Sequence, residues 1–137
     1  MRVRDLMTAT PITVAPMTPM LEARQRMAQA RIRHLIVVED DRLVGIITDR
    51  DIRLNLPSPA TSLSVWELNF LLASLTVRSV MTSAVLVVES HRPIAEAARI
   101  MIDHKIGALP VVDDGRLVGI VTESDFVRAT ADGVHAA

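Results

Sequence analysis

The chain contains two copies of one sequence, separated by a constant distance. Residues 3–54 align without a gap with residues 77–128, so that Val3 corresponds to Val77 and each later residue to the one 74 positions further on. Residues 42–46 and 116–120 are identical in this register. Repetition at a fixed period is typical of a supersecondary unit that buries its apolar face against a copy of itself. With two copies, we expect a pseudo-symmetric pair.

Composition limits the kinds of core and partner that the chain can have. Its 137 residues match one ordinary domain, so we expect the two copies to be halves of one core. Half of the residues are hydrophobic, but the only aromatic side chains are those of Trp66, Phe70 and Phe126. A core of aliphatic, Ala and Met side chains is therefore expected, without the stacking rings that single-stranded nucleic acids need. The net charge of −1 likewise argues against a polyanionic partner.

The sequence also weighs against several kinds of chemistry. It has no Cys, which removes disulfides, thiolate metal ligands and a Cys nucleophile. Its four His residues lack the close spacing of a zinc motif, so we expect no metal. No nucleophile elbow or phosphate-binding glycine loop occurs, which argues against an enzyme. No apolar run approaches the roughly 18 residues of a membrane span and no signal peptide is recognisable, so we expect a soluble cytoplasmic protein.

Each copy predicts the order strand, helix, strand, strand, helix. Pro19 and Pro93 are expected at the first position of a helix, with Thr18 as the N-cap of the first. The two β-rich runs of each copy are separated by residues 39–42 or 113–116, whose acidic residues and Gly favour a hairpin turn. The expected strands are 12–14, 35–38 and 43–47, then 85–88, 109–112 and 117–121; the closing helices are 49–54 and 124–131. This order predicts an α/β (α+β) fold.

One helical face and one connector complete the pattern. Ile94, Ala97, Ala98 and Met101 recur at helical spacing and are assigned to the core. Between the copies, residues 57–62 form a Pro- and Ser-rich loop, and the apolar spacing from Val65 to Leu75 predicts a short helix. Trp66 in that helix is either a packing anchor, between the copies or across a dimer, or a docking residue for a partner protein.

The chemistry of the chain is expected where the second hairpin strand ends. In each copy a glycine, two aliphatic residues and a threonine are followed, three residues after the threonine, by an Asp. A hydroxyl delivered to a helix N-terminus suits a phosphate, and a carboxylate one turn further can accept two hydrogen bonds from a ribose diol. The alternative is structural, because Thr48 or Thr122 would equally cap its helix while Asp51 or Asp125 meets the helix dipole.

Two copies of this pattern, with the Met-Thr opening of each and the apolar run of residues 108–113, resemble a tandem pair of CBS domains, the small regulatory motifs named after cystathionine β-synthase. The resemblance covers about 3–132. It implies motif 1 at 1–56, a connecting loop and short helix at 57–76, motif 2 at 77–132 and a C-terminal tail at 133–137. It also implies two β-α-β-β-α motifs packed as a pseudo-twofold pair, in a stand-alone CBS-domain protein.

The resemblance further implies two clefts that bind adenosine derivatives such as AMP, ADP, ATP or S-adenosylmethionine. In each, the Asp would hold the ribose, the Thr and the residue two positions on would face the phosphates, and aliphatic residues would enclose the base. One cleft would use Thr48, Arg50, Asp51, Ala84, Leu86, Ile106, Gly107 and Ala108; the other Thr122, Ser124, Asp125, Thr10, Ile12, Ile32, Arg33 and His34.

The two clefts are expected to differ in affinity. Where the second copy has the small residues Gly107 and Ala108, the first has Arg33 and His34, which would crowd the base. Arg50 would add a cation beside the phosphates, and arginine binds phosphate in a bidentate way. We therefore expect tighter binding in the cleft that contains Arg50, although Arg50 could equally be a solvated surface charge.

These observations predict a regulatory module that senses an adenine nucleotide and signals in trans, to a protein effector, or through its oligomeric state. The resemblance implies a homodimer, for which Met20, Met27, Ile94 and Met101 could supply the interface, with the intrachain core as the alternative. A second hypothesis is a structural dimerisation or adaptor protein with vestigial clefts, whose partner binds at 57–75. A nucleic-acid-binding regulator, resting on scattered arginines, is the weakest because the total charge is nearly neutral.

Overall fold

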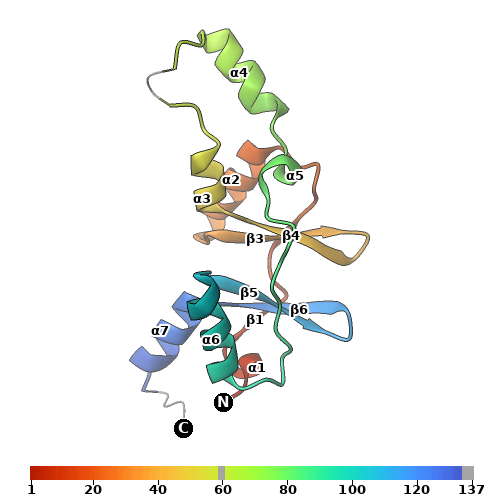
Figure 1. The fold of residues 1–137 in the computed structure, drawn as a ribbon, viewed down its shortest axis with the longest axis vertical. Helices are drawn as coiled ribbons and strands as arrows, with labels where there is room; N and C mark the ends of the chain where they lie inside the picture. Colours follow the sequence, from red (N-terminus) through yellow and green to blue (C-terminus); the bar gives the residue numbers. More distant parts are fainter. Residues whose placement is uncertain (59–60, 134–137) are drawn as a thin grey trace. The chain divides into compact units, whose positions relative to one another are not determined.

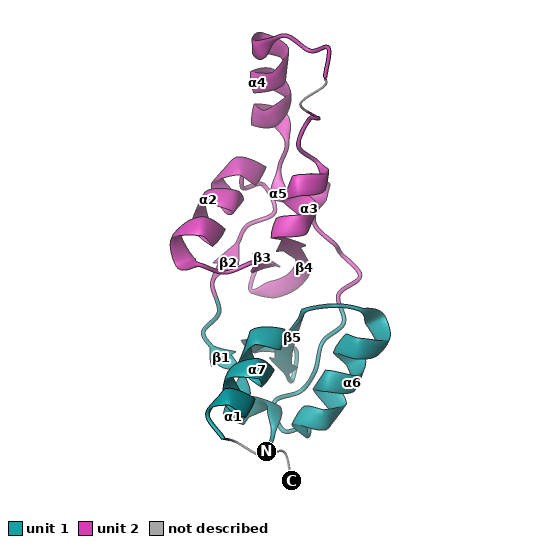
Figure 2. Cartoon of the chain, turned by 90° about the vertical axis from the view of Figure 1, so that its left-hand side faces the viewer, with its two compact units in different colours: residues 1–11, 86–137 teal, residues 12–85 magenta. Residues whose placement is uncertain are grey.

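The structure is a computed structural model that describes residues 1–58 and 61–133. Part of the predicted loop, residues 59–60, and the end of the predicted tail with His135 lie outside the described residues. The chain divides into two compact units that do not follow its linear order. Unit 1 combines Met1–Pro11 with Leu86–Ala137, and unit 2 is Ile12–Val85 (Figure 2). The first residues of the chain thus belong to the same unit as its last helix.

Unit 2 is a three-stranded sheet with helices on one face. The sheet order is β2-β3-β4, with β2 parallel to β3 and β3 antiparallel to β4. Helices α2 and α3 lie on the same face of this sheet (Figure 1). The elements are β2 (Thr13–Val14), α2 (Met20–Ala30), β3 (His34–Glu39), β4 (Arg42–Thr48), α3 (Asp49–Leu54), α4 (Val65–Ser74) and α5 (Val77–Val80).

Unit 1 repeats the same design with the second copy of the sequence. Its sheet order is β1-β6-β5, with both pairings antiparallel, and α6 and α7 cover one face. The elements are α1 (Val3–Leu6), β1 (Thr8–Ala9), α6 (Ile94–His104), β5 (Ala108–Asp113), β6 (Arg116–Thr122) and α7 (Glu123–Ala131). The predicted α/β (α+β) class is therefore confirmed, with two sheets and helices in each unit.

Both hairpins close with the turn that their sequences indicate. Asp40 and Asp41 have φ values of 52° and 62°, and Asp114 and Gly115 have 50° and 78°. Positive φ at both central residues defines a type I′ turn, whose twist matches that of the flanking strands and which favours Asp, Asn and Gly. These acidic residues are accordingly turn residues, as the sequence indicates.

Each unit is completed by a segment from the other copy of the sequence. In unit 1, β1 pairs with β6 through Thr8 and Ile120. In unit 2, the equivalent residues Thr82 and Ile46 exchange two backbone hydrogen bonds of 2.9 Å. The short helices α1 and α5, which the sequence does not predict, precede these contacts. The N-terminal segment of each copy therefore docks on the hairpin of the other.

The exchanged segments contribute to the cores as well as to the sheets. Val3 is fully buried in the core of unit 1, and Val77, its equivalent, is fully buried in that of unit 2. Backbone N–H groups hold both in place: Val3 donates to Arg92 at 2.9 Å, and Val77 donates to Thr18 at 2.8 Å. Burying a Val side chain contributes about 1.5–3 kcal/mol. Each exchanged segment is thus an integral part of the unit that it joins.

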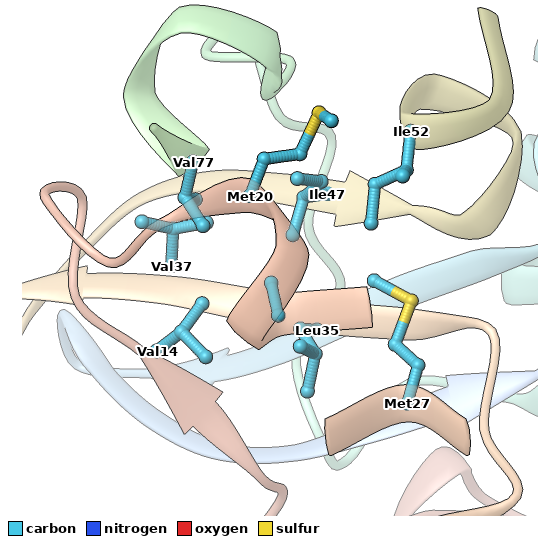
Figure 3. Close-up of a cluster of buried hydrophobic side chains, with 9 residues drawn as sticks. Val14, Met20, Met27, Leu35, Val37, Ile47, Ile52 and Val77 are labelled. Carbon is cyan, nitrogen blue, oxygen red and sulfur yellow. The ribbon is translucent and has the colours of Figure 1, made fainter. Parts of the chain in front are cut away.

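The methionine positions proposed for a dimer interface belong to the intrachain cores. Met20 and Met27 pack with Leu35 in unit 2 and are at most 3% exposed (Figure 3). In unit 1, Met101 is 5% exposed and Ile94 is 7% exposed. The predicted core face of α6 is confirmed, since Ala97 is fully buried. The alternative of an exposed stripe at these positions is wrong, because the sheet of the same unit already covers them.

Two local predictions need correction. Pro19 and Pro93 are the N-caps of α2 and α6 and not the first helical residues, and the side chain of Thr18 does not cap α2. The strand predicted at 85–88 is reduced to one parallel bridge between Val88 and Val111. At the next ladder position Pro110 has no N–H to donate, whereas the first copy has Ile36 there and forms β2.

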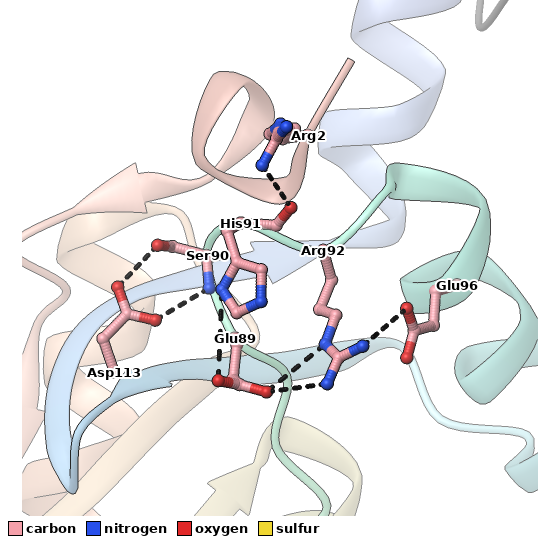
Figure 4. Close-up of polar contacts among 7 residues, drawn as sticks. All are labelled: Arg2, Glu89, Ser90, His91, Arg92, Glu96 and Asp113. Atoms are coloured by element: carbon pink, nitrogen blue, oxygen red, sulfur yellow. Dashed lines mark hydrogen bonds and ion pairs between the residues drawn. The ribbon is translucent and has the colours of Figure 1, made fainter.

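A polar cluster ties the loop before α6 to the end of β5 in unit 1 (Figure 4). Asp113 accepts hydrogen bonds from the hydroxyl of Ser90 and from its backbone N–H at 2.9 Å. Arg92 pairs with Glu89 at 3.1 Å. The bonds from the Ser90 side chain and backbone lower the pKa of Asp113 below its ordinary 3.8, helped by the positive charges of His91 and Arg4.

Ser90→Ala is expected to lower the free energy of unfolding by about 1 kcal/mol at neutral pH, the value of a partly exposed hydrogen bond to a charged group. Since the pKa of Asp113 is lowered on folding, its contribution is present above 3.8 and is lost as the pH falls from there through the lowered value. We expect urea unfolding of the wild type and of Ser90→Ala, measured from pH 7 to pH 3, to show that the difference between their free energies of unfolding becomes smaller in acid. An exposed serine changed in the same way, Ser83→Ala, is the control; a difference that stays constant with pH would contradict the assignment.

Candidate functional site

In unit 2, the predicted site residues gather at the end of β4. His34 and Thr48 are cross-strand neighbours in the β3–β4 hairpin. The N–H of Asp49 donates to the carbonyl of Arg33 at 2.9 Å, which fixes the start of α3 against the residue before β3. Asp51 lies in the first turn of α3. The structure therefore brings together the strand start and the helix start of the first copy.

Unit 1 repeats this arrangement with the second copy. Ala108 and Thr122 are cross-strand neighbours, and the N–H of Glu123 donates to the carbonyl of Gly107 at 3.0 Å. Ala108 is 6% exposed, and Asp125 is 7% exposed. Such burial of an ionisable side chain requires hydrogen-bond partners. Each unit thus places a threonine and a carboxylate at one end of its sheet. Beside them lie the small residues Gly107 and Ala108 in unit 1, and the basic residues Arg33 and His34 in unit 2.

The remaining predicted residues lie on the flanking segments. Ile12, Ile32 and Ala84 belong to unit 2, and Thr10, Leu86 and Ile106 to unit 1. Ile12 is 46% exposed and Leu86 is 40% exposed, which leaves apolar surface at these positions. Arg50 and Ser124, two residues after their threonines, are both exposed. The part of these flanking residues in ligand binding stays a prediction.

The threonine and the carboxylate of unit 2 form a reciprocal helix cap. The N–H of Thr48 donates to Oδ2 of Asp51 at 2.9 Å, and the N–H of Asp51 donates to Oγ1 of Thr48 at 3.1 Å. This is the capping-box arrangement, so the structural alternative accounts for these contacts. Among the described residues, however, Oδ1 of Asp51 and the hydroxyl proton of Thr48 have no hydrogen-bond partner. One acceptor and one donor remain for a ligand.

The equivalent groups of unit 1 are more fully occupied. Oδ2 of Asp125 accepts from the N–H of Thr122 at 2.8 Å and from its hydroxyl at 3.2 Å. Oδ1 accepts from Arg128 at 3.3 Å, and 67% of the Arg128 side chain is exposed. Sequence reasoning missed Arg128, although its spacing of three residues from Asp125 on a helix is the signal that would identify the pair. A ligand that uses Oδ1 of Asp125 would share it or compete for it with this arginine.

Within 1–58 and 61–133, no group of three or more His, Asp or Glu residues is placed to hold a metal ion. Among the helices of residues 1–58 and 61–133, none combines the length with the apolar character that spanning a membrane requires.

Comparison with protein families and known proteins gives one consistent result. The model of the CBS domain matches the chain twice, at residues 3–58 and 77–132. A CBS domain-containing protein of Dictyostelium discoideum is 36% identical over 127 residues, which cover 91% of this chain and 88% of that protein. Other relatives are enzymes of which the chain matches only a part: it spans 21% of an inosine-5'-monophosphate dehydrogenase of Thermoplasma acidophilum, at 36% identity.

Solved structures with this fold include two with bound adenosine compounds. The CBS domain pair of protein MJ0100, in complex with 5'-methylthioadenosine and S-adenosyl-L-methionine, aligns with a TM-score of 0.81 and 30% identity over 97% of this chain and 98% of that one. CBSX2 in complex with AMP aligns with a TM-score of 0.77 and 31% identity over 98% of both chains.

Proposed function

The chain belongs to the CBS domain family, and we propose that it is a regulatory module that binds an adenosine-containing ligand, such as AMP, ADP, ATP or S-adenosylmethionine. The proposal is supported by the adenosyl compounds bound to MJ0100 and CBSX2. In this chain, the observation that carries it is the pair of available groups on Asp51 and Thr48. Among the described residues, Oδ1 of Asp51 and the hydroxyl proton of Thr48 have no partner, so they offer an acceptor to a ribose diol and a donor to a phosphate.

The proposed ligand contacts follow from the chemistry of these side chains. Asp51 and Asp125 each accept hydrogen bonds from a ribose, with Thr48 and Thr122 donating to the phosphate or its equivalent. Arg50 is exposed and is two residues from Thr48, so it can add a charge-assisted contact to an anionic ligand. The exposed aliphatic side chains of Ile12 and Leu86 contribute contacts to the base. Each ligand is proposed to draw on residues of both copies of the sequence.

The proposed role is regulatory rather than catalytic. The residues around Asp51 and Asp125 supply helix caps, hydrogen-bond acceptors and a cation, which are groups suited to holding a ligand. A sensor of this kind acts through the free energy of ligand binding, which favours one conformation or oligomeric state over another. The signal would pass in trans to a protein effector or through the oligomeric state of the chain.

Thermal unfolding with AMP, ADP, ATP and S-adenosylmethionine tests this function. A ligand present at about 100 times its dissociation constant adds roughly 2.7 kcal/mol to the free energy of unfolding, and we expect one compound to raise Tm by several degrees. The controls are adenine alone and ribose 5-phosphate, which each carry half of the recognised groups. No shift with any adenosyl compound would contradict the proposal and favour the adaptor hypothesis, in which residues 57–75 carry the partner surface.

A further inference from the structure

Each exchanged segment carries a methionine whose sulfur lies against a glycine of the hairpin that receives it. In unit 1, a Cβ built on Gly119 would lie 2.7 Å from Sδ of Met7. In unit 2, a Cβ built on Gly45 would lie 2.5 Å from Sδ of Met81. Both glycines are buried. The sulfur therefore fills the space that the side chain of any other strand residue would occupy, as close packing of a protein interior requires.

These two methionine contacts hold the exchanged segments in place. Met7 packs against the core of unit 1, and Met81 packs against the core of unit 2. The threonine that follows each methionine forms the backbone pairing with the receiving hairpin. At its other end, each segment is held by a fully buried valine, Val3 or Val77. A chemical change at either sulfur therefore acts on the docking of a whole segment.

The two side chains are accessible to an oxidant, unlike the methionines of the core clusters. The chain has seven Met and no Cys, so all of its sulfur atoms are thioethers. Met7 and Met81 are partly exposed. Met20, Met27 and Met101 are at most 5% exposed. Because susceptibility to oxidation follows exposure, a small oxidant in water should reach the first two much faster than the other three.

Hydrogen peroxide converts such a thioether to a sulfoxide. The sulfur attacks one peroxide oxygen, so that an S–O bond forms and the O–O bond breaks. The proton of the transferred oxygen passes to the leaving hydroxide, which becomes water. The sulfur gives up two electrons and the peroxide is reduced by two. The product side chain is polar where the thioether was apolar.

A sulfoxide is poorly accommodated above these glycines. Outside the methionine itself, the atom nearest to the Cβ position is a carbonyl oxygen, that of Thr8 at 2.8 Å for Gly119 and that of Thr82 at 3.0 Å for Gly45. A carbonyl oxygen only accepts hydrogen bonds, as does a sulfoxide oxygen, so the two groups repel each other. Burying a polar group without a donor is costly. The oxidised side chain therefore favours water, and the segment loses its contact with the glycine.

We propose that Met7 and Met81 are oxidation sites, at which hydrogen peroxide weakens the docking of the N-terminal segment of each copy on the hairpin of the other. The modification is reversible, because methionine sulfoxide reductases restore the thioether. It uses none of the proposed ligand contacts and stands independently of them.

Two exposed side chains serve as internal controls. Met17 is 67% exposed and lies outside the exchanged segments and both core clusters. Its oxidation should be fast and should leave the stability unchanged. Trp66, the only Trp, is 85% exposed on α4. The prediction that Trp66 anchors the two copies within one chain is therefore wrong, and its oxidation should likewise leave both units intact.

Hydrogen exchange followed by mass spectrometry, before and after peroxide treatment of the wild-type chain, tests the proposal. Peptide mapping identifies which methionines have gained an oxygen. With sulfoxide at Met7 and Met81, the backbone amides of residues 3–8 and 77–82 should exchange about tenfold faster, equivalent to about 1.4 kcal/mol of weaker docking. Treatment with the reductases should restore the slow exchange. Unchanged exchange after oxidation at both positions would overturn the proposal, as would oxidation of Met17 that spares Met7 and Met81.

The double variant Met7→Leu/Met81→Leu removes both sulfurs at nearly constant volume, a change that cores usually tolerate. Peroxide should leave the Tm of this variant unchanged and should lower that of the wild type by several degrees. Met17→Leu, which removes one exposed sulfur, is the matched control and should lose as much as the wild type. An equal loss in the folded double variant would overturn the proposal by placing the effect at another side chain. If the double variant does not fold, hydrogen exchange of the wild type decides.

Discussion

Gly119→Val is expected to lower the free energy of unfolding by about 3 kcal/mol, the upper end of the usual cost of overpacking. A Cβ at Gly119 would lie 2.8 Å from the carbonyl oxygen of Thr8 and 2.7 Å from Sδ of Met7. The sulfur can move, but the carbonyl belongs to β1, which pairs with β6 at this position. The substitution therefore has to displace the exchanged N-terminal segment from unit 1. Urea unfolding followed by circular dichroism measures the loss.

Without the clash, Gly119→Val should raise the free energy of unfolding, because valine favours a strand over glycine by up to about 1 kcal/mol. A loss of stability would therefore show that the added side chain collides with β1. Gly45→Val is the matched variant, since Gly45 occupies the equivalent position on β4. There the nearest atom to an added Cβ is Sδ of Met81, at 2.5 Å, and the carbonyl oxygen of Thr82 is 3.0 Å away. A methionine sulfur that can move is present at both sites, so the carbonyl oxygen makes the difference, and we expect a smaller loss at Gly45, where that oxygen is further from the added Cβ. Stability equal to or above that of the wild type in Gly119→Val would contradict the docking of β1 across β6.

Asp51→Ala is expected to weaken adenosyl-ligand binding by about 10- to 100-fold, the value of hydrogen bonds to a charged group, about 1.5–3 kcal/mol. Asp125→Ala should weaken it less, because Arg128 competes with the ligand for Oδ1 of Asp125, whereas Oδ1 of Asp51 has no such competitor among the described residues. Calorimetric titration of each variant with the ligand found by thermal unfolding measures both losses. A larger loss in Asp125→Ala would contradict the proposed order of affinities.

Two controls separate binding from folding in this comparison. Asp51 accepts the N–H of Thr48, so Asp51→Ala also removes a helix-capping contact worth about 1 kcal/mol. The titrations are therefore made well below Tm, and Asp51→Asn, which keeps an acceptor for that N–H, is measured beside it. Asp49→Ala removes an exposed carboxylate of the same helix, paired with Arg53 at 3.1 Å, and should leave the affinity unchanged.

Local signals in the sequence were sufficient to predict most of the elements. The hairpins follow from β-branched runs around Asp and Gly residues with positive φ, and both closing helices begin within one residue of their predicted starts. The core face of α6 follows from helical spacing. The strand predicted at 85–88 was wrong because Pro110 has no N–H to donate to it. Only a single bridge between Val88 and Val111 forms there.

The exchange of segments could not be predicted from the same signals. Residues 3–8 and 77–82 are nearly the same sequence, and both hairpins that could receive them contain the same five residues, 42–46 and 116–120. Nothing local distinguishes docking within a copy from docking on the other copy. The exchange is seen only in the folded chain, where Val3 is buried in the core of unit 1 and Val77 in the core of unit 2.

The candidate site was predicted in part. The spacing of three residues between Thr48 and Asp51 correctly indicated that they interact at a helix start. The same spacing at Thr122 and Asp125 does not reveal that the hydroxyl there donates to the carboxylate, or that Arg128 holds the second oxygen. The two copies share the spacing of Thr and Asp, but the second has Arg128 where the first has Leu54, and their side-chain hydrogen bonds differ. The assignment of ligand contacts to all of these residues stays a prediction.

Isothermal titration calorimetry of the wild-type chain and of the double variant Asp51→Ala/Asp125→Ala, each with AMP and with S-adenosylmethionine, tests most directly whether the chain senses an adenosyl ligand. The account predicts saturable binding of one of these compounds to the wild type and its loss in the double variant, with circular dichroism showing both proteins folded. Absence of binding to the wild type, or binding of equal affinity in the double variant, would contradict it.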